Sequence, residues 1–192
     1  MSTSTRDDNR LFVAMDLPND VRAHLAGVAI ELAAEHGGRA VPAENLHATL
    51  SFLGKVRPSR VPEITAELSG AAPRSAVGAR LDALRARPGG KARLIAAQVE
   101  LESADDAEVI EQLRVAVEEV ADVTASSEEE HPLWLHVTLV RFGRPTRVAN
   151  LPDVRWEQVF AFNEITLYDS YLRTAEPPRY EQVATVALET PA

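Results

Sequence analysis

Apolar residues recur along the chain in two rhythms, one typical of strands and one of amphipathic helices. Strands are predicted where apolar and polar residues alternate, or where a short apolar run stops at turn residues. Helices are predicted where apolar residues recur every three or four positions behind a capping residue. The predicted strands are 11–17, 46–52, 78–87, 94–101, 135–140, 160–168 and 180–188, and the predicted helices run from Asn19 or Asp20 to Gly37, from 58 to 70, and from Ser103 or Asp105 to Val120.

The order of these elements predicts an α+β fold. Strands and helices are mixed in both halves of the chain, which favours two antiparallel sheets with helices on their outer sides. The polar first nine residues predict a disordered tail, 1–9. We expect the rest, 10–192, to form a single domain with two lobes.

Composition and charge narrow the classes of function. The chain has no cysteine, so disulfides, cysteine-ligated zinc, iron–sulfur clusters and thiol nucleophiles are excluded. The absence of cysteine fits a cytoplasmic protein. The apolar run 11–17 is too short to cross a membrane, so no membrane association is expected. A net charge of −9 argues against non-specific nucleic-acid binding, although it leaves a local anionic ligand open.

One short phrase occurs twice. Residues 45–54 read NLHATLSFLG and residues 134–143 read WLHVTLVRFG. Both contain Leu-His-x-Thr-Leu and both end on Gly, so five positions match. A repetition of this kind indicates an internal duplication, with one copy in each half of the chain.

Alternation along a strand sorts each phrase into a polar and an apolar face. In each copy the imidazole and the hydroxyl lie one pleat apart on the same side. The predicted polar faces are His47, Thr49 and Ser51 in the first copy and His136, Thr138 and Val140 in the second, with Leu46, Ala48, Leu50 and Phe52, and Leu135, Val137 and Leu139, on the opposite faces.

Two histidines and two threonines around one cleft suit a phosphodiester. Because imidazole titrates near neutral pH, one ring can act as a base while the other acts as an acid. Threonine hydroxyls can donate hydrogen bonds to phosphate oxygens. The set lacks a carboxylate and makes a poor metal site, so neither a metal nor a cofactor is expected.

These phrases resemble the 2H phosphoesterases, and among them the bacterial RNA 2′,3′-cyclic phosphodiesterases, also called 2′-5′ RNA ligases (the LigT/ThpR group). Residues 45–54 resemble the family's first motif closely. The segment Arg10–Pro18 looks like its first strand, and Glu164–Ser170 with Arg179-Tyr180 look like its C-terminal strands. The resemblance covers nearly the whole chain.

The resemblance implies two pseudo-symmetric lobes around a central cleft, and hydrolysis of 2′,3′-cyclic phosphate ends to 2′-phosphates. It also implies reversible 2′-5′ joining of RNA ends. His47 then protonates the departing 3′ oxygen, His136 activates water, and Thr49, Thr138 and Arg141 hold the phosphate. The expected partners are RNA ends, short oligonucleotides or cyclic nucleotides, bound by a cytoplasmic monomer.

Two features of the second copy depart from the simple picture. Strict alternation places Arg141 on the face opposite His136, so either the strand bulges or ends near Val140, or Arg141 is structural. The family usually precedes its second histidine with Arg-Pro-Phe-x-Pro, whereas residues 131–135 read HPLWL. Trp134 or a protonated His131 is expected to replace the lost substrate contacts, with Trp134 stacking on a base; a core position for Trp134 is the alternative.

Two other functions fit the same residues. The acidic surface favours small substrates, so the substrate could be another small cyclic phosphate, such as ADP-ribose cyclic phosphate or a cyclic mononucleotide. A non-catalytic module that binds phosphorylated ends or protein partners is the third reading. A binder has less need of two titrating side chains, which favours an enzyme.

Overall fold

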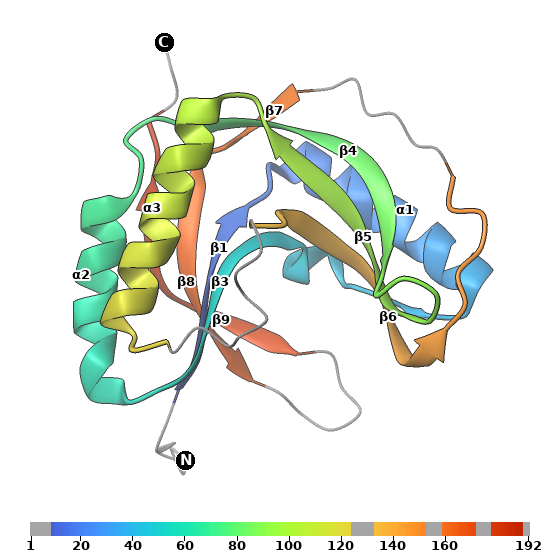
Figure 1. Ribbon diagram of the computed structural model, residues 1–192, viewed down its shortest axis with the longest axis horizontal. Helices are drawn as coiled ribbons and strands as arrows, with labels where there is room; N and C mark the ends of the chain where they lie inside the picture. Colours follow the sequence, from blue (N-terminus) through green and yellow to red (C-terminus); the bar gives the residue numbers. More distant parts are fainter. Residues whose placement is uncertain (1–8, 124–132, 153–158, 172–177, 190–192) are drawn as a thin grey trace.

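A computed structural model describes residues 9–123, 133–152, 159–171 and 178–189, whose strands form one curled antiparallel sheet (Figure 1). The sheet order is β7-β4-β5-β6-β3-β1-β8-β9, with β2 beside β6. The elements are β1 (Asn9–Asp16), α1 (Asn19–His36), β2 (Arg39–Ala40), β3 (His47–Val56), α2 (Val61–Ala71), β4 (Val77–Arg87), β5 (Ala92–Leu101), α3 (Ala104–Val120), β6 (His136–Thr146), β7 (Val159–Phe162), β8 (Glu164–Tyr171) and β9 (Arg179–Ala187), with short 3-10 turns at Ala43–Asn45 and Pro58–Arg60.

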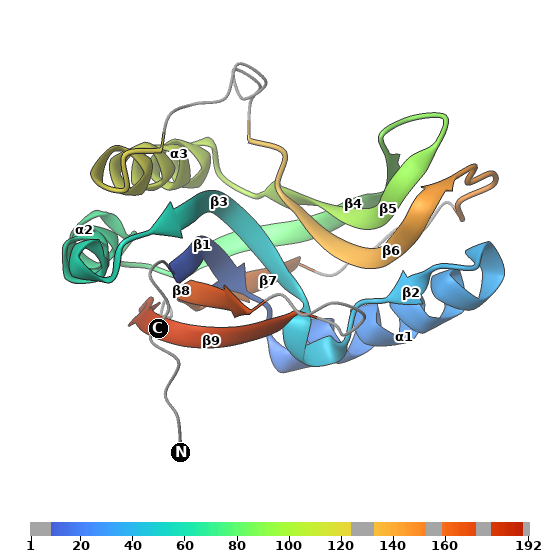
Figure 2. The same cartoon turned by 90° about the horizontal axis from the view of Figure 1, so that it is seen from below.

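The sheet is divided into two lobes at the junction of β3 and β6. These two strands pair at Ala48 and Val137, and along the rest of their described length they diverge. One lobe contains β1, β3, β8 and β9, and the other contains β4, β5, β6 and β7. Seen from below, the two groups curve away from each other on either side of this junction (Figure 2). The predicted α+β fold with two lobes is confirmed, but the strands form one continuous sheet rather than two, because β3 and β6 pair at the junction.

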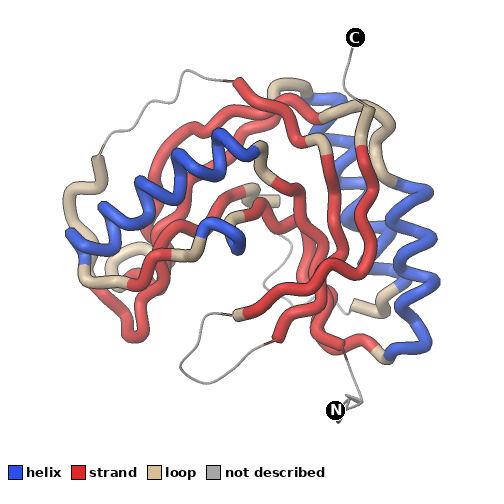
Figure 3. Tube along the Cα trace, turned by 180° about the vertical axis from the view of Figure 1, so that it is seen from behind, coloured by secondary structure: helices blue, strands red, loops and turns tan. Residues whose placement is uncertain are grey.

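The helices cover the lobes in a crossed arrangement. Helix α1 follows β1 in the chain but packs against β6 and β2 of the other lobe. Helices α2 and α3 pack against each other and against β9 and β3 (Figures 1 and 3). Each lobe therefore has its outer face covered, although the covering helix does not always come from the neighbouring part of the chain.

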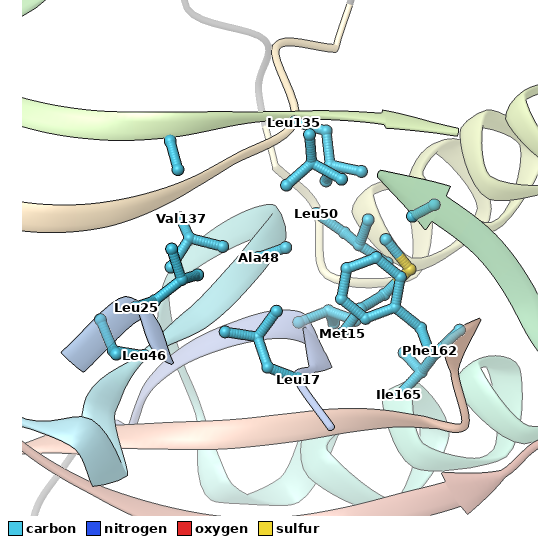
Figure 4. Packing of buried hydrophobic residues seen from close by; sticks show 14 of the residues in the cluster. Met15, Leu17, Leu25, Leu46, Ala48, Leu50, Leu135, Val137, Phe162 and Ile165 are labelled. Carbon is cyan, nitrogen blue, oxygen red and sulfur yellow. The ribbon is translucent and has the colours of Figure 1, made fainter. Parts of the chain in front are cut away.

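A single hydrophobic core runs through both lobes. Met15 and Leu50 of the first lobe and Val137 of the second belong to one cluster of buried side chains, which α1 joins through Leu25 (Figure 4). All four are at most 3% exposed. Burying one such side chain contributes about 1.5–3 kcal/mol. The junction of the lobes is thus held by packing as well as by backbone pairing.

Most predicted element boundaries are confirmed within a few residues, but three details differ. The predicted strand 160–168 is two strands, because the chain leaves β7 and joins β1 as β8 after Asn163. Helix α1 is preceded by Pro18 as its N-cap and has no side-chain cap, whereas Ser103 caps α3 as predicted. Strand β2, with two residues, is too short to show a periodic pattern. Apart from Asn9, which already belongs to β1, the expected tail lies outside the described residues.

Gly38 connects α1 to β2 where the backbone approaches β6 closely. A Cβ atom at this position would collide with Cγ1 of Val140 and lie 2.9 Å from Cε1 of Phe142. Both neighbours are buried and cannot move aside freely. We expect Gly38→Ala to lower the free energy of unfolding by about 1–3 kcal/mol.

Thermal unfolding measures this effect, which corresponds to a fall in Tm of roughly 2–4 °C per kcal/mol for a chain of this size. Gly89→Ala is the matched control, because no atom lies within 4 Å of a Cβ placed there. Equal Tm values for the two variants would contradict the close approach at Gly38.

Candidate active site

A β-bulge interrupts β3 three residues after its histidine. Val13 pairs with Ser51 while Ala14 pairs with Thr49, so Leu50 is the extra residue in this strand. Beyond the bulge the two faces exchange. Ser51 turns inward and donates a hydrogen bond of 2.6 Å to Glu118 on α3, whereas Phe52 is 67% exposed and lines the cleft. The predicted faces of Ser51 and Phe52 are therefore wrong.

A matching bulge lies in β6, again three residues after the histidine. Ile95 pairs with Val140 and Ala96 with Thr138, which makes Leu139 the extra residue. The bulge returns Arg141 to the side of the sheet that carries His136 and Thr138. This settles the conflict with strict alternation, because the strand does bulge, as one of the two expected explanations requires. Val140, predicted on the polar face, is buried instead.

Each lobe contributes one half-site, His47 with Thr49 from β3 and His136 with Thr138 from β6. The two half-sites face one cavity of about 710 Å³. Its walls include the four side chains that the repeated phrase singles out, together with Arg141 and Trp134. The pairing of Ala48 with Val137 places the residues that follow the two histidines side by side. The structure thus brings together His47, Thr49, His136 and Thr138, as the sequence predicts; His131 lies outside the described residues.

His47 is fixed by a hydrogen bond to the backbone. Its Nδ1 lies 2.8 Å from the carbonyl oxygen of Asn45, and because a carbonyl only accepts, Nδ1 carries the proton. The Nε2 atom is then free to exchange a proton with a ligand. Asn45 is itself held by a hydrogen bond of 2.8 Å from its amide to the carbonyl of Pro178.

The surroundings of His47 disfavour its charged form. Burial lowers its pKa from 6.5 to about 4, and the positive charge of Arg141 acts in the same direction. The hydrogen bond to Asn45 and the carboxylate of Asp16 oppose this shift. Phe12 and Tyr180 lie against the imidazole, with ring centroids 5.0 and 5.4 Å away. In the free protein His47 is therefore neutral at pH 7.

His136 repeats this arrangement with different neighbours. Its Nδ1 lies 2.8 Å from the carbonyl oxygen of Trp134, which again leaves Nε2 free. The indole of Trp134 stacks on the imidazole with a centroid distance of 3.9 Å and an interplanar angle of 16°. Burial lowers the pKa of His136, and the positive charges of Arg141 and Arg87 lower it further, against the opposing hydrogen bond to Trp134.

A buried carboxylate next to the site was not predicted from sequence. Asp16 is the strand neighbour of His47 and is 8% exposed. It accepts hydrogen bonds of 2.6 Å from the hydroxyl of Tyr168 and 2.7 Å from Thr166. Burial and this carboxylate raise the pKa of Tyr168 to about 12. The only signal in the sequence is the acid that interrupts the apolar run 11–17.

Other cavity residues also escaped prediction. Arg39 on β2 is the strand neighbour of Arg141, and both line the cavity. Phe52 and Arg141 occupy equivalent positions in the two half-sites, since each follows its histidine by five residues. Tyr180 reaches the cavity from β9. Such residues are brought in by strand pairing across the chain, which no local pattern reveals.

The described residues provide neither a metal centre nor a membrane span. No group of three or more His, Cys, Asp or Glu side chains among them is placed to hold a metal ion. None of the helices in the described ranges is both long and apolar enough to cross a membrane.

A curled two-lobed sheet with one His-x-Thr strand from each lobe is the architecture of a two-histidine phosphoesterase. A family model described as LigT like phosphoesterase matches residues 15–89. A curated RNA 2′,3′-cyclic phosphodiesterase from Archaeoglobus fulgidus is 42% identical over 60 residues, 31% of this chain and 34% of that protein. The match thus spans about a third of the relative's length.

Solved structures resemble the whole chain. The protein TT0787 of Thermus thermophilus has a TM-score of 0.78 and 28% identity, covering 93% of this chain and 97% of that one. Escherichia coli LigT, in its complexes with NADP+ and with 3′-AMP, has a TM-score of 0.71 and 25% identity, covering 94% of this chain and 98% of that one. The chain is thus similar to the LigT-like phosphoesterases, in sequence over residues 15–89 and in fold over nearly its whole length.

Proposed function

We propose that the protein is a phosphodiesterase that opens 2′,3′-cyclic phosphates at RNA ends or on nucleotides and leaves a 2′-phosphate. The observation that carries the proposal is the convergence of both His-x-Thr pairs on one cavity. Each histidine donates its Nδ1 proton to a backbone carbonyl, so both Nε2 atoms are available for proton transfer. The cyclic phosphodiesterase of Archaeoglobus fulgidus supports the choice of substrate.

The reaction is a displacement at phosphorus by water. The Nε2 atom of His136 takes a proton from water as its oxygen attacks, and the bond from phosphorus to the 3′ oxygen breaks. Protonated His47 gives its Nε2 proton to that oxygen, so the phosphate stays on the 2′ oxygen. Proton exchange with solvent then restores both imidazoles. The same displacement with a 5′ hydroxyl in place of water, in which the bond to the 3′ oxygen again breaks, joins RNA ends through a 2′-5′ bond.

Neighbouring groups stabilise the negative charge that develops on phosphorus. The hydroxyls of Thr49 and Thr138 are placed to donate hydrogen bonds to the non-bridging oxygens, and Arg141 adds a positive charge. Structures of Escherichia coli LigT in complex with 3′-AMP and with ATP show that a relative binds phosphate-bearing ligands. Like that relative, this chain is expected to bind nucleotides.

Incubation with a 2′,3′-cyclic mononucleotide and with an oligonucleotide ending in a cyclic phosphate tests the proposal. The expected product is a 2′-phosphate, identified by ³¹P NMR. A chelator is expected to leave the rate unchanged, because the mechanism uses imidazoles alone. Turnover of only another small cyclic phosphate would favour the alternative substrate, and tight binding of phosphorylated ends without turnover would favour a binding module.

We expect the pH optimum of kcat to lie above that of kcat/KM. The second quantity reports the free enzyme, in which the pKa of His47 is about 4 and that of His136 is also lowered. Bound phosphate places a negative charge beside both rings and raises both pKa values. Rate profiles between pH 4 and 9 measure the two optima. Coincident optima would contradict the idea that the substrate itself supports protonation of His47.

A further inference from the structure

The second half-site differs from the first in the group that covers its histidine. The indole of Trp134 lies flat on His136, 3.9 Å between centroids, while the carbonyl of the same residue accepts the Nδ1 proton. One residue therefore fixes both the plane and the rotation of the imidazole. In the first half-site Asn45 supplies the carbonyl, but its side chain turns away to Pro178.

Arg87 on β4 completes the group around Trp134. Its guanidinium carbon lies 4.9 Å from the centroid of a ring of Trp134, a distance typical of a cation–π contact. Within the described part of the chain Arg87 forms no ion pair. A cation–π contact contributes roughly 0.5–1 kcal/mol at an exposed site, enough to favour one orientation of the indole.

We propose that Trp134 and Arg87 form a positioning pair for His136, in which the indole orients the ring and the guanidinium holds the indole and adds positive charge beside it. The proposal rests on the proposed function, because it assigns the pair to the base of that reaction. It also gives Trp134 a different role from the predicted stacking on a substrate base, because the ring that the indole stacks on is the imidazole of His136.

Charged groups around His136 are predominantly positive. Burial is the largest cause of the lowered pKa of His136, and the positive charges of Arg141 on β6 and of Arg87 lower it further. The other titratable groups that line the cavity are Arg39 from β2, His47 from β3 and Tyr180 from β9. Arg85 of β4 binds Gln98, the β5 neighbour of His136, at 3.3 Å and also pairs with Asp82. No Asp or Glu belongs to the described cavity wall.

Titration of His136 by NMR tests the charge of Arg87. The full chain is labelled at its five histidines, and the His136 signal is assigned with a His136→Gln variant. Arg87→Gln is expected to raise the midpoint of His136 by about half a pH unit, a difference that shrinks in 1 M salt. Arg87→Lys retains the charge and should restore most of the shift. Arg144→Gln, which removes an exposed charge outside the cavity wall, should leave the midpoint unchanged.

Kinetics of Trp134→Leu test the orienting role of the indole. Because aromatic stacking is worth about 0.5–1.5 kcal/mol, kcat is expected to fall about 3- to 10-fold while KM stays constant. Trp134→Phe keeps an aromatic face and should fall less. A raised KM with unchanged kcat would overturn the proposal and favour a substrate contact.

The NMR titration and the kinetic measurements together distinguish failure of this proposal from failure of the proposed function. An unchanged His136 midpoint in Arg87→Gln would overturn the charge role of the pair, whether or not any substrate is turned over. Absence of turnover by the wild-type chain would instead contradict the proposed function, and the titration would still decide whether Arg87 acts on His136.

Discussion

Replacing either cavity histidine with alanine is expected to lower kcat by about 10²- to 10⁴-fold, the usual contribution of a general acid or base. In the proposed mechanism His136→Ala removes the group that takes the proton from water, and His47→Ala removes the one that protonates the leaving oxygen. KM should change less, because the proposed phosphate contacts of Thr49, Thr138 and Arg141 remain. Steady-state rates with a cyclic nucleotide measure the effect.

Two comparisons make this loss interpretable. His24→Ala is the matched control, because His24 is an exposed histidine on α1 outside the cavity wall. Because the two histidines act together in one step, the loss of kcat in the double variant His47→Ala, His136→Ala should be smaller than the product of the two single losses. Full activity of either single variant, with an unchanged Tm, would refute the two-histidine mechanism.

The free energy of unfolding is expected to fall by about 2–3 kcal/mol, through His47 alone, as the pH drops from 6.5 toward 4. The folded-state pKa is lowered to about 4, whereas the unfolded chain binds the proton near 6.5. Over this window the unfolded state binds more protons, so stability decreases with decreasing pH. Above pH 6.5 both states are neutral at this site and the contribution is constant.

Denaturant unfolding at several pH values measures the effect, and a variant isolates it from the carboxylates that titrate in the same range. His47→Gln cannot be protonated and should lose less stability between pH 6.5 and 4 than the wild type. Inorganic phosphate, which favours the charged imidazole, should reduce the difference. Parallel curves for the two proteins would show that burial of His47 does not disfavour its charge.

The parts of this fold that show a regular local pattern of apolar and polar residues could be predicted from sequence. The strands that carry His47 and His136, and the convergence of their polar faces on one site, follow from alternation and from the repeated phrase. The exchange of faces after Leu50 and Leu139 could not be predicted, because a bulge arises from pairing with a distant strand. For the same reason alternation alone places Phe52 on the wrong face.

Residues contributed by pairing across the chain could not be predicted either. Asp16 looks like an interruption in an apolar strand, and its position beside His47 follows only from the register between β1 and β3. Arg87 has no sequence signal that links it to Trp134, since β4 and β6 are separated by β5 in the sheet. The altered residues before His136 predict a special role for this segment, but the stacking of Trp134 on His136 depends on the orientation of one indole, which no sequence pattern gives.

The crossed helices have a consequence for how the two halves of the chain depend on each other. The apolar side of α1, with Leu25 and Leu32, packs against β6 from the second half of the chain as well as against the short strand β2, whereas α3 from the second half packs against β3. A fragment containing one half would expose the apolar side of its own helix to water. We therefore expect neither half to fold on its own, since the two histidines face one cavity only in the folded whole chain.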